Sequence, residues 1–112
     1  MTIQKLEKSQ WHPFLDRLSQ LLPAKQAEIE VASLDLGDQV EAEWLPLIGI
    51  TYDPKNDLVE VALESVDHLI HKPRELYIDN GAGPLTRLEI VDADGVRQIV
   101  KLRDPLMLPP PR

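Results

Sequence analysis

Apolar residues recur at helical spacing near the start of this chain. They fall within an arc of roughly 120° when about 100° is allowed per residue, and polar residues fill the rest of the turn. Ser9 stands before them as an N-cap, and Pro23 ends the pattern. The spacing therefore predicts one amphipathic helix whose apolar stripe packs on a core. The stripe consists of Trp11, Phe14, Leu15, Leu18, Leu21 and Leu22.

Strand-like sequence surrounds a turn in the middle of the chain, between Leu45 and Glu64. The turn residues 53–56, Asp-Pro-Lys-Asn, place Pro second and Asn where a left-handed residue is wanted. We expect a β-hairpin with a type I turn and a bulge, in which Asp53 pairs with Asp57. One face of this hairpin then carries Leu47, Val59, Val61 and Leu63, and the other carries Ile48, Ile50, Tyr52 and Leu58.

The second of these two faces needs a cover. A helix is about 10 Å across, so a single helix covers one face of a sheet over only part of its width. Exposed apolar patches on soluble chains usually mark interfaces, and a symmetric dimer is the commonest way to cover one. We therefore expect a homodimer through this patch, or another protein partner. The alternative is that the helix covers the patch itself.

An earlier hairpin is predicted over residues 27–44, with its turn at Gly37-Asp38. Its core face carries the even-numbered Val40, Ala42 and Trp44, whereas the central hairpin needs odd-numbered residues inside. A bulge near Leu45-Pro46 would reconcile the two and bend the strand sharply. The opposite face is acidic and carries Glu28, Glu30, Glu41 and Glu43.

The later sequence predicts a third hairpin around residues 92–95, with Leu88 opposite Val100 and Ile90 opposite Gln98. The fold class is therefore α+β, in a single domain spanning 1–112. The N-terminal helix packs on an antiparallel meander of five or six strands, bent into a small barrel of Sm or SH3 type. The alternative is an open antiparallel sheet with the helix on one face. Residues 1–8 are expected to form a loose arm, and residues 106–112 a Pro-rich tail.

Charge narrows the range of partners. The chain of 112 residues has a net charge of −7, and residues 28–67 alone carry one Lys and eleven acidic residues. An acidic middle repels phosphates and anionic lipid, so we expect neither nucleic acid nor a membrane surface as partner. There is no Cys, no long apolar run and no apolar signal region, and we expect a cytoplasmic protein.

Candidate chemistry is sparse. Residues 65–73 break the strand alternation and suggest one helical turn capped by Ser65, on which His68 and His71 share a face as weak metal-ligand candidates. These histidines and the glutamates would be the basis of a small metal-dependent or carboxylate enzyme, our alternative function. No Gly-rich phosphate loop, GxSxG motif or Cys nucleophile is present, so we expect no cofactor and favour a non-catalytic interaction or assembly module.

Four segments together carry a resemblance that covers nearly the whole chain: KSQWHPFLDRL, AEIEVASLDLGDQVEAEWLPLIGITYDPKNDLVEVAL, DHLIHKPRELYID and LEIVDADGVRQIVKL. They resemble a family of small bacterial proteins catalogued as a domain of unknown function, which implies no activity and no site residues. The order of helix and turns is also similar to the Sm-like barrel, whose RNA contacts rely on an Asp and an Asn beside basic and aromatic residues. Asp53 and Asn56 have those residue types here, but Pro54 separates them and the surroundings are acidic.

Overall fold

The computed structural model describes residues 3–21, 25–33, 37–79 and 87–103. The end of the predicted helix, at residues 22–23, and the predicted Pro-rich tail lie outside these ranges. The described elements are β1 (Ile3–Leu6), α1 (Lys8–Leu21), β2 (Gln26–Ser33), β3 (Gly37–Asp53), β4 (Leu58–Leu63), β5 (Val66–His71), β6 (Pro73–Asp79), β7 (Arg87–Asp92) and β8 (Arg97–Arg103).

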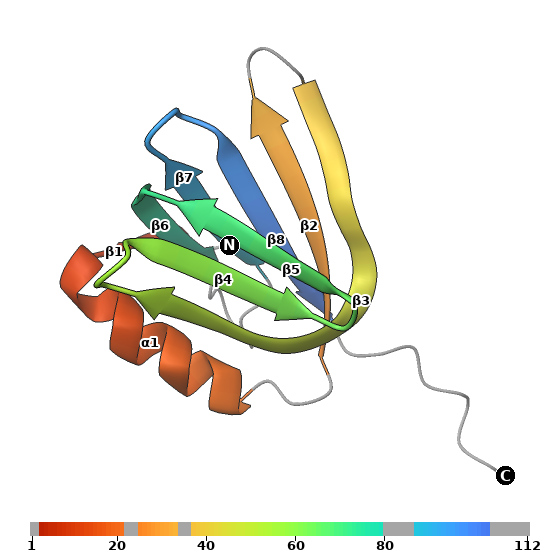
Figure 1. Ribbon diagram of the computed structural model, residues 1–112, viewed down its shortest axis with the longest axis horizontal. Coiled ribbons are helices and arrows are strands. Elements are labelled where there is room, and N and C mark those ends of the chain that lie inside the picture. Colours follow the sequence, from red (N-terminus) through yellow and green to blue (C-terminus); the bar gives the residue numbers. More distant parts are fainter. Residues whose placement is uncertain (1–2, 22–24, 34–36, 80–86, 104–112) are drawn as a thin grey trace, which may run out of the picture.

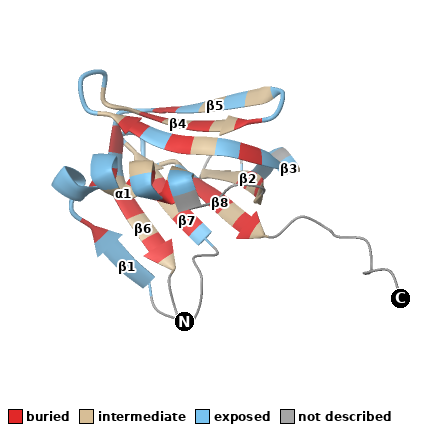
Figure 2. Ribbon diagram, turned by 90° about the horizontal axis from the view of Figure 1, so that it is seen from below, coloured by how far each residue is buried: buried red, intermediate tan, exposed pale blue. Residues whose placement is uncertain are grey.

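The eight strands form one antiparallel sheet in the order β1-β6-β7-β8-β2-β3-β4-β5, which is folded over on itself. The first part of β3 pairs with β2 and the last part pairs with β4. Figures 1 and 2 show a first layer, made of β1, β6, β7, β8, β2 and the first half of β3. A second layer, made of the second half of β3, β4 and β5, faces it. The α+β class is confirmed, with eight strands where five or six were expected.

The strand order is that of an open sheet, which was the alternative expectation. Among the described residues β1 pairs only with β6, and β5 pairs only with β4. A closed small barrel is therefore not confirmed. The helix lies along the side between the two layers, where it contacts β3 and β6.

The core lies between the two layers and under the helix. Trp11 is 1% exposed, and its Nε1 donates a hydrogen bond to the Leu6 carbonyl oxygen over 3.1 Å. Its ring meets the Tyr52 ring edge to face, with centroids 5.2 Å apart. The predicted stripe is thus a core stripe where it is described. The helix begins at Lys8, one residue before the expected cap Ser9, and Pro13 lies inside it.

The bend of β3 follows from extra residues in that strand. Its register shifts twice against β2 and once against β4, and Trp44 has a φ of 48°. The expected change of phase is confirmed, and it begins just before Leu45-Pro46. Val40, however, is 54% exposed and lies on the outer side, so its inward placement was wrong. Ser33 pairs with Gly37, so the expected turn at Gly37-Asp38 is also wrong and both residues belong to β3.

The central hairpin is present, with a register one residue away from the expected one. Asp53 pairs with Leu58 instead of Asp57, and the left-handed residue of the turn is Asp57, with a φ of 50°. Because side chains alternate along a strand, this slip moves Ile50 and Tyr52 to the inner face, where Leu47, Val59, Val61 and Leu63 are buried as predicted. Ile50 now lies opposite Val61. The turn therefore decides which apolar residues of β3 enter the core.

Three further comparisons complete the fold. The last hairpin is confirmed, with Leu88 opposite Val100 and Ile90 opposite Gln98. The loose arm is wrong over its described part, because Ile3–Leu6 pairs with β6 as strand β1. The helical turn at 65–73 is wrong as well, because the turn at Glu64-Ser65 leads directly into β5 and Pro73 begins β6. Ser65 has a φ of 72° there and caps no helix.

Candidate interaction surface on the second layer

Strand alternation directs one set of side chains of the second layer away from the first layer, and we call this set the outer face. Two of its members are large apolar residues that remain open to solvent, Ile48 at 69% and Leu69 at 43% exposed. The helix covers the side of the fold and leaves this face bare in Figure 2. The outer face consists of Ile48, Thr51, Leu58, Glu60, Ala62, Asp67, Leu69 and His71.

The structure divides the apolar patch that the sequence suggested. Ile50 is 1% exposed and Tyr52 is 5% exposed, so both belong to the core and cannot form an interface on the surface. Their expected exposure was wrong because of the one-residue slip of the hairpin. Ile48 is exposed as expected, and Leu58 is half-buried on the outer face.

A pair of carboxyl groups lies among these apolar residues. Glu60 on β4 and Asp67 on β5 share a hydrogen bond, and this bond and the like charge of Asp67 raise the pKa of Glu60. Both residues line an open hollow of about 390 Å³ together with Ile48, Ala62 and Val66. The outer face therefore combines apolar contacts with negative charge that no described cation offsets.

The far edge of the second layer is formed by β5. Its pairing with β4 runs from Leu58 opposite His71 to Leu63 opposite Val66 without a register shift. Strand edges of soluble proteins are usually protected by Lys, Pro, a bulge or a covering segment. The strand contains neither Lys nor Pro, and no described element other than β4 pairs with it. Such an edge is open to pairing with another strand.

The opposite edge of the same layer is covered. The hydroxyl of Ser19 on α1 accepts a hydrogen bond from the Ile50 amide over 2.9 Å and donates one to the Ile50 carbonyl over 2.7 Å. Further along, Nδ1 of His12 donates to the Tyr52 carbonyl oxygen over 3.1 Å. The helix thus supplies the polar partners that a neighbouring strand would otherwise give to β3.

A chain of side chains holds β5 against the first layer. Nε2 of His68 lies 2.5 Å from Oε1 of the buried Gln98 on β8, and Nε2 of Gln98 donates to Asp92 over 3.1 Å. The carboxylate fixes the Gln98 amide so that its oxygen faces the histidine. An amide oxygen only accepts, so Nε2 of His68 carries a proton. This chain positions the strand and gives His68 a structural role.

The two histidines are not brought together. In a strand, residues three positions apart point to opposite faces, so His68 points toward β8 while His71 lies on the outer face. The expectation of a shared face rested on a helical turn and was wrong. No group of three metal-ligating side chains occurs among the residues that the structure describes.

The four glutamates of the predicted acidic face are only partly together. Glu28 and Glu30 lie on β2 beside the basic strand β8, and Lys101 forms an ion pair with Glu30 over 3.2 Å. The hydrogen bond from Lys101 holds the pKa of Glu30 below its usual value. Glu41 and Glu43 are exposed in β3, next to its register shifts. The sheet topology therefore offsets part of the charge that seemed concentrated in the sequence.

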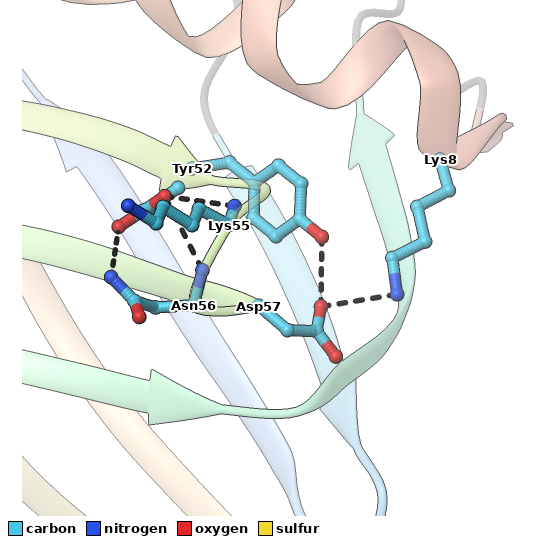
Figure 3. Close-up of polar contacts among 6 residues, drawn as sticks. Lys8, Tyr52, Lys55, Asn56 and Asp57 are labelled. Carbon is cyan, nitrogen blue, oxygen red and sulfur yellow. Dashed lines mark hydrogen bonds and ion pairs between the residues drawn. The ribbon is translucent and has the colours of Figure 1, made fainter.

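The turn that carries the Sm-like residue types uses them internally. Asp53 accepts hydrogen bonds from the amide of Lys55 over 2.9 Å and from Nδ2 of Asn56 over 2.6 Å. Figure 3 shows the neighbouring contacts, in which Asp57 accepts from the Tyr52 hydroxyl over 2.7 Å and pairs with Lys8 over 3.1 Å. These bonds stabilise the turn.

Sequence reasoning missed three residues that organise this region. Gln98 was paired with the apolar Ile90 in the last hairpin, and a polar side chain beside apolar residues requires a partner when buried, which was a usable signal. Ser19 and Leu69 gave no such signal. Ser19 looked like one polar residue among several on the helix, and Leu69 belonged to a segment that was interpreted as a helical turn.

The fold and this surface define a small α+β protein with a folded antiparallel sheet, whose second layer has one edge covered by α1 and one edge, β5, that pairs with no described element other than β4. The chain belongs to a family of unknown function (DUF5335), whose model matches residues 2–111. It is 41% identical over 110 residues to an uncharacterized protein of Aquifex aeolicus (strain VF5), an alignment that covers 97% of this chain and 99% of the relative. No solved structure matches. No helix in the described ranges is long and apolar enough to cross a membrane.

Proposed function

We propose that this protein is a non-catalytic assembly module that self-associates through its second layer. One observation carries the proposal: β5 is a regular edge strand beside exposed apolar side chains and pairs with no described element other than β4, while the other edge of the same layer is covered by α1. A second copy of the chain supplies a matching edge by symmetry.

The charge of the second layer supports a specific kind of contact. Two outer faces pressed together would oppose their Glu60 and Asp67 carboxyls, which is unfavourable for like charges. Contact along the β5 edge keeps the acidic pairs apart and still covers Leu69. We therefore place the interface at this edge and its border on the outer face.

The alternative of a small enzyme has less support. It needs His68, His71 and several glutamates to converge, but the two histidines face opposite sides of β5. Of the glutamates, Glu30 is engaged with Lys101 on the first layer. The described residues give the assembly module a surface and give the enzyme no shared site.

Sedimentation velocity and light scattering from micromolar to several hundred micromolar protein test the proposal. We expect the wild type to approach twice the monomer mass as concentration rises, and Leu69→Glu to remain monomeric. Ile3→Glu is the matched control, because Ile3 is 65% exposed on β1 at the other end of the sheet. Circular dichroism and urea unfolding verify that each variant is folded.

Two outcomes would reject the proposed function. One is a wild type that stays monomeric at the highest concentration. The other is a dimer that Ile3→Glu disrupts while Leu69→Glu leaves it intact, because that result would move the interface to the first layer.

A further inference from the structure

We propose that two copies pair through β5 in one antiparallel register, with Leu69 opposite Leu69 of the second copy. This inference rests on the proposed self-association and specifies its geometry. The two second layers then form one continuous six-stranded sheet across the two-fold axis. The proposal follows from the direction of the backbone groups of β5, from the symmetry of the pairing, and from charge.

The hydrogen bonds of β4 determine which backbone groups of β5 are free. The amide of Lys72 donates to the Asp57 carbonyl oxygen over 3.0 Å, so these two residues form a hydrogen-bonded pair across β4 and β5. Such pairs alternate along antiparallel strands, so His68 and Ile70 also bond to β4. The amide and carbonyl groups of Asp67, Leu69 and His71 therefore point toward the bare edge.

The covered edge of β3 gives the same answer independently. The backbone groups of Ile50 point to Ser19 on α1 and not to β4. Gly49 and Thr51 consequently bond to β4 at Ala62 and Glu60. Val61, between them, bonds to β5 at its partner His68. The hydrogen bonds at both edges of the second layer thus indicate that the backbone groups of Asp67, Leu69 and His71 point away from β4.

Symmetry then limits the register. In an antiparallel dimer with its axis perpendicular to the sheet, each outward-facing residue lies opposite another outward-facing residue. When the axis is centred on Leu69, all three outward-facing residues find an outward-facing partner. Leu69 lies opposite Leu69 of the second copy, Asp67 lies opposite its His71, and His71 lies opposite its Asp67. Each of these three pairs can exchange two backbone hydrogen bonds. Centring the axis on His68 or Ile70 leaves one of the three without a matching free partner.

Charge favours the same register. Centring the axis on Asp67 would set two carboxylates directly opposite each other, which is unfavourable. The Leu69-centred register instead sets Asp67, already beside the acidic Glu60, against His71 of the second copy, twice in each dimer. It also joins two half-exposed Leu69 side chains at the axis. The contacts are therefore apolar at the centre, and at each end an imidazole N–H can donate a hydrogen bond to a carboxylate.

The structure also prepares this strand for pairing. The hydrogen bond from His68 to Gln98 ties the inner side of β5 to β8, and the ladder to β4 has no bulge. The edge is thus presented already straight, which reduces the entropy lost on association. His68 is in this sense a positioning residue for the interface.

Disulfide trapping tests the register, because the natural chain contains no cysteine. In a hydrogen-bonded antiparallel pair the Cα atoms are about 5.5 Å apart, within the range of a disulfide. We expect Leu69→Cys to cross-link with itself under mild oxidation. Asp67→Cys and His71→Cys should each cross-link poorly alone and efficiently when the two variants are mixed. Ile3→Cys on β1 is the matched control for random collision.

A charge exchange gives a second, independent measurement. Asp67→Lys should weaken dimerisation on the order of tenfold, because each of the two Asp67–His71 pairs loses the carboxylate that accepts a hydrogen bond from the imidazole. The double variant Asp67→Lys, His71→Asp should restore the wild-type dissociation constant. Sedimentation equilibrium provides these constants, with Arg74→Glu as an exposed control outside β5.

The outcomes separate this inference from the proposed function. A dimeric wild type in which Asp67→Cys cross-links with itself, or in which the double variant is not restored, would overturn the register and leave self-association standing. A monomeric wild type would overturn both. Selective trapping at Leu69, together with the mixed pair, would establish the register.

Discussion

The two edges of the second layer have the same kind of backbone and opposite surroundings. Along β3, the edge is buried under α1, and the polar groups of Ile50 are satisfied by Ser19. Along β5, the corresponding groups of Asp67, Leu69 and His71 find no partner strand among the described elements. Because the fold covers the β3 edge of this layer with a helix, the open β5 edge requires an explanation of its own.

This contrast assigns the β3 edge to the stability of the monomer and the β5 edge to the association of two chains. Residues that cover β3 lie in the core or bond to it, and their loss should be felt by the monomer. The outward side chains of β5, those of Asp67, Leu69 and His71, are exposed, and their loss should be felt only where two chains meet. Four measurements, from the largest expected effect to the smallest, examine that division.

Trp11→Ala should give the largest loss. Trp11 is 1% exposed, bonds to the Leu6 carbonyl and packs against Tyr52, so its removal leaves a cavity under the helix. We expect the free energy of unfolding to fall by about 3–5 kcal/mol, measured by urea denaturation. A loss below about 1 kcal/mol would show that α1 does not seal the β3 edge.

Ser19→Ala should lower the free energy of unfolding by less than Trp11→Ala, because it removes two hydrogen bonds but leaves no large cavity. The Ile50 amide would lose its partner in a partly buried place, which typically costs about 1–3 kcal/mol. Gln20→Ala, at the exposed neighbouring position, is the control and should stay within about 0.5 kcal/mol of wild type. Equal behaviour of the two variants would mean that water replaces the hydroxyl at this edge.

Tyr52→Phe should lose about 1–2 kcal/mol near neutral pH, because Asp57 loses a hydrogen bond. Burial and that bond raise the pKa of Tyr52 to about 12, so the contribution is present below about pH 10, the unfolded value, and is lost as pH rises through 12. The same bond lowers the pKa of Asp57, so the contribution is present above about pH 4 and is lost as pH falls through the folded value.

Urea unfolding of wild type and Tyr52→Phe across this pH range measures the difference in stability. We expect the difference in the free energy of unfolding between the two proteins to be largest near neutral pH and to become smaller at both low and high pH. Tyr77→Phe on the first layer is the control for the second tyrosine, whose hydroxyl bonds to Glu75 at the surface. A gap that does not change with pH would contradict the role of the Tyr52–Asp57 bond.

Leu69→Lys should have the smallest effect on the monomer. At protein concentrations below those at which the wild type associates, we expect a change within about 0.5 kcal/mol, since the side chain is 43% exposed. Thermal or urea unfolding under dilute conditions measures it. A loss comparable to that of Ser19→Ala would show that β5 is covered within the monomer and would remove the contrast between the edges.

The parts of this fold that the sequence predicted well depend on local chemistry. The helix stripe and the last hairpin have strong periodicity and an unambiguous Asp-Ala-Asp-Gly turn, and both are confirmed with their partners. Asp92 in that turn bonds to the amides of Asp94 and Val96, as the residue type indicates. Local turn geometry there determines the register by itself.

The parts that failed depend on a single residue or on distant strands. One additional turn residue at Asp57 moved Ile50 and Tyr52 from the surface to the core, because the period of a strand is two. The acidic segment was expected to remain uncompensated because nothing local shows that β8, with Lys101, lies beside β2. Sequence spacing also could not reveal that β5 is a strand, since its alternation is short and interrupted.

The pairing of β2 with β8 has a consequence for synthesis of the chain. Strands β2 to β5 follow one another in the chain and can pair as soon as they leave the ribosome. Strand β2 can pair with β8 only after the end of the chain has been made, because Ala27 lies opposite Leu102. At about 5–20 residues per second, several seconds pass before the last strand is available. During that interval β2 has an open edge of its own, and the apolar side that will face the core is uncovered. The nascent chain therefore has two strand edges without a partner strand, that of β2 and that of β5. The pairing of β8 covers the β2 edge and leaves the β5 edge open.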